Sequence, residues 1–174
     1  MQDNWYEAAV SFTGPHRIVS VVDWASDAPD SYPTVLPGTY NVFPWGINDP
    51  SVANRSMVEE PFDTLASPIG WHAVSLANDP QSESIRGNNK TGLFRNTTTT
   101  WGNNVFAHEN WSGRNVWVDN YRPDGGAEKI FNFSYDPKWT NSSQESLDEA
   151  KKYIDAVVTQ LFYTSNLVHD LFYR

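Results

Sequence analysis

The chain has no cysteine among its 174 residues. Without thiols it can form neither a disulfide framework nor a thiolate metal site. Cysteine usage therefore does not indicate whether the protein occupies an oxidising or a reducing compartment. Long apolar runs are also missing, since no stretch approaches the roughly 18 apolar residues that a membrane-spanning helix needs. The first residues, Met1 to Asn4, lack the basic and then apolar order of a secretory signal. If the protein is secreted, we expect its signal to lie upstream of this sequence.

Positive charge is scarce, with 12 Lys and Arg against 21 Asp and Glu and a formal net charge of −9. An acidic chain is not attracted to phosphate backbones or anionic lipids, so we exclude nucleic acid and membrane surfaces as partners. Aromatic residues are plentiful by contrast, with 8 Trp, 8 Tyr and 9 Phe. They can build the core of one globular domain, or of one domain with a small appendage.

The first part of the chain, residues 5–26, predicts a β-hairpin. An apolar stretch ends at Phe12, residues 13–16 have turn composition, and the β-branched run 18–24 follows. Residues 27–38 then predict an exposed linker, because three prolines spaced four apart remove backbone donors and favour extended backbone. Exposed linkers of this kind are where proteases cut.

Beyond the linker, residues 39–141 predict short strands and loops, with strand-like patches at 115–119 and 129–135. Residues 142–174 predict one amphipathic helix that opens with a capping box, Ser142 with Glu145 or Ser146 with Glu149. Apolar residues three and four apart mark its expected buried face: Leu147, Ala150, Ile154, Val157, Leu161, Val168 and Leu171. The predicted fold class is therefore α+β, mostly short antiparallel strands and loops followed by a long C-terminal amphipathic helix. No capping residue follows this helix, so we expect the sequence to be part of a longer protein.

Acceptor sequences for N-glycosylation are frequent in this chain. The pattern Asn-x-Ser/Thr occurs at Asn54, Asn89, Asn96, Asn110, Asn132 and Asn141. A chain rich in Asn, Ser and Thr can generate such patterns by accident. We prefer the interpretation that the protein is glycosylated in a secretory pathway.

The histidines do not form a recognisable catalytic pattern. His108 and Glu109 begin the zinc-protease motif H-E-x-x-H, but Ser112 stands where the second histidine should be. His16 and His72 are isolated and predict surface or turn positions, and His169 beside Asp170 predicts a hydrogen-bonded residue on the helix. No G-x-S-x-G motif or phosphate-binding glycine loop occurs. The residues alone therefore indicate no catalytic site.

Four stretches carry a resemblance to one protein family. Residues 39–51 (TYNVFPWGINDPS), 100–110 (TWGNNVFAHEN) with 120–123, and 160–173 (QLFYTSNLVHDLFY) are long and specific. Together they resemble the N-terminal part of mature fungalysin, a secreted fungal elastinolytic metalloproteinase. Residues 18–28 (IVSVVDWASDA) are similar to the end of that family's inhibitory prosegment.

The resemblance implies two parts and an incomplete thermolysin-like N-terminal subdomain. Residues 1–38 would be the C-terminal tail of the prosegment with its linker. Residues 39–174 would be the β-rich N-terminal part of the metalloproteinase domain, ending before the zinc motif. In such proteases two histidines of H-E-x-x-H and a later glutamate hold zinc, and the motif's glutamate takes a proton from the attacking water. These groups would lie beyond Arg174, so no catalytic or metal-binding residue is assigned here and the chain alone is expected to be inactive.

The resemblance also implies how the whole protein would work. It would be a secreted, extracellular monomer with zinc as its cofactor, with protein and peptide substrates, and with its own prosegment as an intramolecular inhibitor. His169 and Asp170 match the family's helix motif and are expected to tie that helix to neighbouring loops.

A non-catalytic extracellular module is the alternative hypothesis. An acidic, aromatic, β-rich chain can be a carbohydrate-binding module whose aromatic faces stack on sugar rings. The spacing of the tryptophans does not select such a platform over core packing, which we favour: Trp101, Trp111, Trp117 and Trp139. Retention on insoluble polysaccharide would distinguish the module from the protease.

Overall fold

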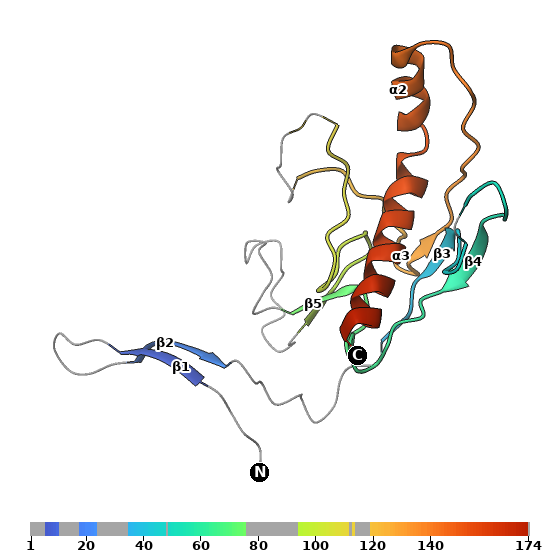
Figure 1. The fold of residues 1–174 in the computed structure, drawn as a ribbon. Coiled ribbons are helices and arrows are strands. Elements are labelled where there is room, and N and C mark those ends of the chain that lie inside the picture. The colour runs from blue at the N-terminus through green and yellow to red at the C-terminus, as the bar shows by residue number, and fades with distance from the viewer. Residues whose placement is uncertain are drawn as a thin grey trace. The chain divides into compact units, whose positions relative to one another are not determined.

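A computed structural model of the chain describes residues 6–10, 18–23, 35–47, 49–75, 94–111, 113 and 119–173 (Figure 1). It divides into two compact units, Met1–Pro33 and Thr34–Arg174. Short strands in small sheets are followed by two helices, so the fold is α+β, as predicted. None of the described helices has the length and apolar character required to cross a bilayer.

The first unit contains the predicted hairpin. Strand β1 (Tyr6–Val10) pairs with β2 (Ile18–Asp23) in an antiparallel ladder, with an irregularity between Ala9 and Val10. The predicted turn at 13–16 lies outside the described residues, as does most of the predicted linker up to residue 34.

The second unit is built around a three-stranded sheet of order β4-β3-β7. Strand β3 (Thr39–Val42) runs antiparallel to β4 (Ser56–Glu59) and parallel to β7 (Ile130–Phe131). A separate antiparallel pair joins β5 (Ala73–Ser75) to β6 (Phe94–Asn96). The sheet and the pair are made of short segments, and their buried residues are Tyr40, Val42, Ala73, Val74 and Phe131.

Of the two strand-like patches predicted from the sequence, the one at 129–135 needs correction and the one at 115–119 lies almost entirely outside the described residues. The patch at 129–135 is a strand only at β7, because Lys129 has a positive φ of 52° and the ladder ends at Phe131. The alternation that suggested a strand persists as burial, since Phe131 is buried while its neighbours on each side are exposed. Of the patch at 115–119, only Asp119 is described, and it lies in a turn.

The predicted single helix is two helices, α2 (Ser143–Lys151) and α3 (Ile154–Tyr173). The Ser142 half of the first predicted capping box is present, because the Ser142 side chain accepts the Glu145 backbone N–H at 3.2 Å. The Glu145 carboxylate accepts the backbone N–H of Asn141, at 3.1 Å, rather than that of Ser142. A tight turn at Lys152 and Tyr153 then interrupts the helix, with backbone bonds from both N–H groups to residues three positions earlier. Figure 1 shows the two helices nearly in line, with α2 above α3.

The predicted buried face of this helix is wrong. Val157, Leu161 and Leu171 are 52%, 51% and 56% exposed, and the other predicted members are exposed or half-buried. The buried face of α3 consists instead of small, aromatic and polar residues: Ala156, Val158, Thr159, Phe162, Tyr163, Asn166 and Asp170. Three of these buried side chains, Thr159, Asn166 and Asp170, are polar. Because the prediction counted only apolar residues as buried, it selected a different face of the helix.

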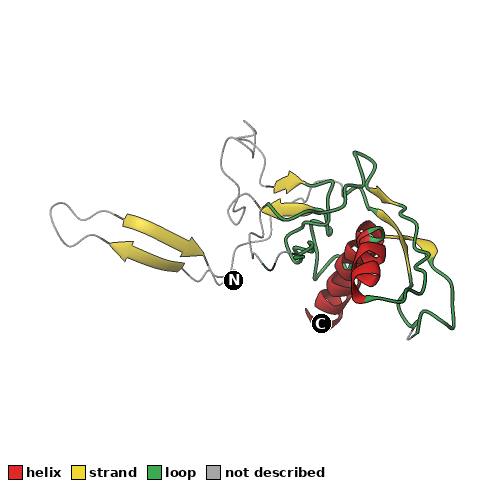
Figure 2. Cartoon of the chain, turned by 90° about the horizontal axis from the view of Figure 1, so that it is seen from above, coloured by secondary structure: helices red, strands yellow, loops and turns green. Residues whose placement is uncertain are grey.

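The core lies between α3 and the three-stranded sheet. Its buried members are Tyr40, Val42, Trp71, Ala107, Phe131, Val158, Phe162 and Tyr163. The Tyr40 ring is central, stacked on Phe131 at 5.3 Å between centroids and tilted against Phe162 at 6.3 Å. Figure 2, which looks nearly along the helices, shows loops as well as strands around them.

Two side chains extend the contacts of β3 past the end of β7. The Gln160 side-chain amide binds both backbone groups of Phe43, accepting its N–H at 2.8 Å and donating to its carbonyl at 3.2 Å. The Arg55 guanidinium donates to the carbonyl of Asn41 and, at 2.8 Å, to that of Phe133. Side chains therefore satisfy backbone groups that a longer β7 would otherwise pair.

Candidate functional site

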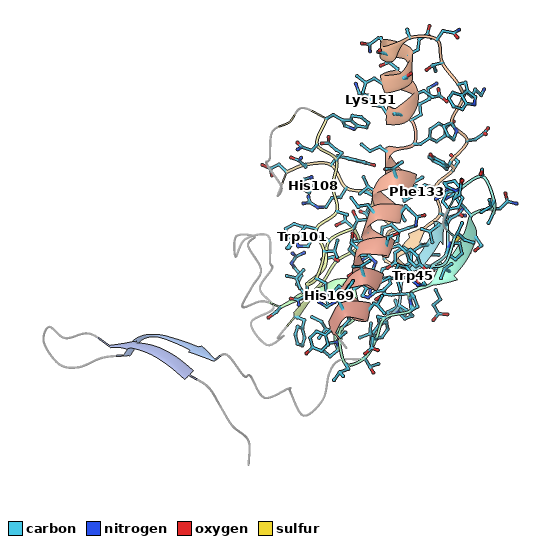
Figure 3. All side chains as sticks on the ribbon, in the orientation of Figure 1. Trp45, Trp101, His108, Phe133, Lys151 and His169 are labelled. Carbon is cyan, nitrogen blue, oxygen red and sulfur yellow. The ribbon has the colours of Figure 1, made fainter. Side chains whose placement is uncertain are left out.

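The predicted histidine positions do not come together in the structure. Figure 3 places His108 and His169 well apart along α3. Across the described segments, no group of three or more His, Cys, Asp and Glu side chains is placed to hold a metal ion. His16 lies outside the described residues.

His108 and Glu109 lie in a loop, not on a helix. The Nδ1 atom of His108 donates to the carbonyl of Glu109 at 2.7 Å. The Glu109 carboxylate accepts the backbone N–H groups of Trp111 at 2.8 Å and of Tyr121 at 3.3 Å. Both side chains therefore close loops, and the spacing that two ligands on one helical turn require is absent at this loop.

Asp170 is the most heavily bonded side chain of α3. One carboxylate oxygen accepts the Ser67 hydroxyl at 2.5 Å and His169 Nδ1 at 2.9 Å. The other accepts the Asp63 backbone N–H at 3.0 Å and the indole N–H of Trp71 at 2.9 Å. Asp170 thereby links the end of α3 to the loop 63–71, while His169 is only partly buried beside it.

The charge of Asp170 is stabilised by these four donors. Burial acts to raise the pKa of its carboxyl, but the hydrogen bonds from Ser67, His169, Asp63 and Trp71 outweigh it. The pKa is consequently lowered from its ordinary value, and the group is an anion at neutral pH. A carboxylate that accepts four hydrogen bonds has its lone pairs occupied, so it is suited to fixing structure rather than to proton transfer.

A second buried carboxylate, Glu60, holds the start of β3 against the chain near Trp71. It accepts the backbone N–H of Gly38 at 2.8 Å and that of Trp71 at 2.6 Å, and the Tyr40 hydroxyl lies 3.1 Å away. Burial raises the pKa of Glu60, opposed by these hydrogen bonds and by the charge of Lys129. The Lys129 ammonium donates to the carbonyl of Leu36 at 2.7 Å.

His72 lies in a turn, which is one of its two predicted positions, but it is buried in the same cluster rather than at the surface. Its Nδ1 donates to the carbonyl of Thr99 at 3.1 Å, so its Nε2 carries no proton and lies 2.6 Å from the Tyr40 hydroxyl, whose single proton is shared between this nitrogen and the Glu60 carboxylate. Burial lowers the pKa of His72 to about 3, and the charge of Lys129 acts in the same direction. A neutral, enclosed imidazole of this kind supports packing of the core, which a search for local histidine patterns could not reveal.

The sequon asparagines that are described all lie at the surface. Asn54, Asn96, Asn110, Asn132 and Asn141 are exposed, and Asn89 lies outside the described residues. The side-chain oxygen of Asn132 accepts a hydrogen bond from Asn41 at 2.9 Å, which leaves the Asn132 amide nitrogen free of that contact. Their exposure is compatible with glycan attachment.

The tryptophans divide between core and surface. Trp101 is 4% exposed, as core packing requires, whereas Trp111 is 47% exposed and Trp139 is fully exposed. For these last two the prediction of core packing is wrong, and Trp117 lies outside the described residues. Trp111 and Trp139 line one groove of about 640 Å³, called here the α2–α3 groove, together with Ile154, Val157 and Leu161 of α3.

Comparison with known proteins identifies one family. Residues 39–174 match the family described as fungalysin metallopeptidase (M36). A probable extracellular metalloproteinase 5 of Trichophyton verrucosum is 36% identical over 173 residues, which are 99% of this chain and 22% of that protein. The extracellular metalloproteinase MEP of Fusarium vanettenii is 35% identical over 169 residues, 97% of this chain and 21% of that protein. The extracellular metalloproteinase mep of Aspergillus terreus is 35% identical over 173 residues, again 22% of its length. This chain spans about a fifth of the length of these relatives.

Proposed function

This chain belongs to the fungalysin metallopeptidase family, and from that premise we propose that it is the N-terminal part of a secreted zinc metalloendopeptidase that hydrolyses extracellular proteins. The observation that carries the proposal is the family match over residues 39–174. Relatives about 35% identical, with names that state an extracellular metalloproteinase, support both the activity and the location. The same relatives give no support to the alternative of a carbohydrate-binding module.

In this proposal the chain supplies scaffold rather than chemistry. All members of the buried core cluster fall within the matched residues 39–174, as do the partners of Asp170. Glu60 binds the backbone of Gly38 near the start of this unit, Asp170 binds the loop that follows Asp63, and both carboxylates bind Trp71. Such fixed elements are what a proteinase needs to hold one wall of its cleft in place.

The residues described here do not fit a zinc site. His72 is enclosed with its Nε2 facing Tyr40, His108 faces a backbone carbonyl, and His169 faces Asp170. Zinc in proteases of this type takes three protein ligands and leaves one position for water. We assign those ligands to the part of the proteinase that corresponds to the remaining four fifths of the relatives' length.

The isolated chain is expected to lack proteolytic activity and to bind no stoichiometric zinc. The chain has no cysteine, and no three His, Asp or Glu side chains among the described residues are placed to hold one ion. Casein hydrolysis and elemental analysis of a chelator-washed sample check this result. Stoichiometric zinc that disappears in His169→Ala but persists in His108→Ala would contradict it, because a site would then exist at α3.

The chain is further proposed to contain a processing junction. Residues 1–38 would be the tail of an inhibitory prosegment with its linker, and residues 39–174 the beginning of the mature, monomeric enzyme. The family match begins at residue 39, which supports this division. The backbone of Leu36 and Gly38 is bound to the core through Lys129 and Glu60, so we expect cleavage to be disfavoured at these two residues.

N-terminal sequencing of the secreted protein is expected to place the mature terminus between Asp27 and Thr39. The prolines of this stretch exclude it from a sheet ladder, so an attacking protease can bind it in extended form. A terminus upstream of Ile18 or downstream of Trp45 would show that the junction is elsewhere. A variant with Pro29, Pro33 and Pro37 changed to alanine serves as the control, since it tests whether extension is what directs cleavage.

A further inference from the structure

The α2–α3 groove presents the apolar stripe that the sequence marks for burial. Ile154, Val157 and Leu161 recur at helical spacing along it, and Val157 and Leu161 are half exposed. Trp111 and Trp139, each from a separate loop, also line it. A soluble domain rarely leaves a contiguous apolar surface of this kind to water, and such a surface usually marks an interface.

The groove is suited to an apolar partner rather than to a charged one. The carboxylates at its rim already have partners, since Glu149 binds Lys152 at 2.6 Å and the Lys138 backbone N–H at 3.0 Å. Glu109 accepts two backbone N–H groups, as described above. The groove therefore presents aromatic and aliphatic side chains, which match the side chains of a folded polypeptide core.

We propose that the α2–α3 groove is the docking surface for the remaining polypeptide of the metalloproteinase, which packs apolar side chains onto Val157 and Leu161. This inference rests on the proposed function. The length of the relatives supplies the argument for this occupant, because about four fifths of their chains lie outside the part that this sequence matches. A segment of the same polypeptide is held at high effective concentration, so it covers the groove without a separate binding partner.

A chimaera tests the proposal, with this chain replacing the matching fifth of the extracellular metalloproteinase MEP of Fusarium vanettenii. Because the chain has no cysteine, Leu161→Cys introduces its single thiol, read by maleimide labelling and mass spectrometry of the peptide that contains it. We expect that thiol to react at least about tenfold more slowly in the chimaera than in the isolated chain, because labelling would require local opening. Val52→Cys, at an exposed position outside the groove, is the control and should react alike in both.

A charge placed in the groove gives a second, independent readout. Val157→Asp is expected to reduce secretion of the chimaera by about tenfold, because the carboxylate would be buried without a partner. Val52→Asp is the matched control and should be secreted like the parent chimaera. In the isolated chain, Val157→Asp should fold as the parent does and bind less hydrophobic dye, since position 157 is exposed there.

The proposal is overturned if Leu161→Cys is labelled equally fast in chimaera and isolated chain, or if Val157→Asp is secreted like Val52→Asp. It is also overturned if the isolated chain is a dimer that Val157→Asp dissociates, since a second copy would then be the occupant. A chimaera that protects Leu161→Cys but hydrolyses no protein supports the docking surface and counts against the proposed function. The two proposals can therefore fail separately.

Discussion

Asp170→Ala is expected to destabilise the chain by about 3–5 kcal/mol, because it removes the acceptor for four donors at once, of which the Ser67 hydroxyl and the Trp71 indole are buried. The partly buried Asp63 backbone N–H and the His169 ring would lose the same acceptor. The end of α3 would also lose its link to the loop 63–71. Urea unfolding followed by circular dichroism and tryptophan fluorescence measures the change.

Asp170→Asn separates the loss of charge from the loss of acceptors. Its amide oxygen can still accept from Trp71 and Asp63, while its NH₂ group faces the Ser67 hydroxyl and the His169 ring, both of which can reorient to accept. We expect this variant to lose about 1–2 kcal/mol. Asp148→Ala, on the exposed side of α2, is the control for removing a carboxylate. Equal stability of Asp170→Ala and Asp148→Ala would refute the structural role.

The Asp170 carboxylate should also make the stability of the folded chain depend on pH. Its pKa in the folded chain is lowered from the ordinary value of 3.8, so the folded state binds its proton less readily than the unfolded state. The stability that Asp170 contributes is therefore present above that ordinary value and is lost as the pH falls through the lowered pKa. The difference between the parent chain and Asp170→Ala should shrink in the same acidic range.

Gly102→Ala is the second substitution with a large expected effect. A Cβ atom at position 102 would lie 1.7 Å from the carbonyl oxygen of Trp71 and 2.8 Å from its carbonyl carbon. The surrounding loop cannot retreat easily, because Gly102 N–H donates to Val105 at 2.9 Å and Ala107 N–H donates to Thr100 at 3.0 Å. We expect a loss of about 3 kcal/mol or more, since overpacking against backbone forces the backbone itself to shift.

Gly113→Ala is the control for the glycine prediction. Position 113 has a positive φ of 65° but nothing within 4 Å of the added Cβ, so only backbone strain of about 1–2 kcal/mol applies. Thermal melting and limited proteolysis compare the two variants with the parent chain. A Gly102→Ala variant that melts at or above the temperature of Gly113→Ala would show that the loop tolerates the shift.

The sequence predicts local features of this fold well. The hairpin of residues 5–26 and the Ser142 cap follow from β-branched runs and capping chemistry, both of which act over a few residues. The break at Lys152 and Tyr153 could not be predicted, because neither residue is a helix breaker. It accompanies tertiary and short-range contacts, including a hydrogen bond from the Tyr153 hydroxyl to the Asp136 carbonyl at 2.5 Å.

The buried polar cluster and the true face of α3 depend on contacts that sequence patterns do not contain. Asp170 meets partners about a hundred positions earlier in the chain, and Tyr40 meets His72 across 32 positions. Because Thr159 and Asn166 are buried as well, the inner face of the helix is less apolar than the α2–α3 groove side. Periodicity therefore identified an apolar face correctly but assigned it to the wrong environment.

The side-chain contacts at the end of β3 also restrain aggregation. Residues 39–43 combine β-branched and aromatic side chains without any charge, a composition that favours strand addition between molecules. Past β7 this strand would offer free backbone groups to a foreign strand, but Gln160 occupies both groups of Phe43 and Arg55 occupies the carbonyl of Asn41. A helix and a neighbouring loop thus act as gatekeepers that stop the sheet from growing on that side, where a longer strand would leave an open template for fibrils.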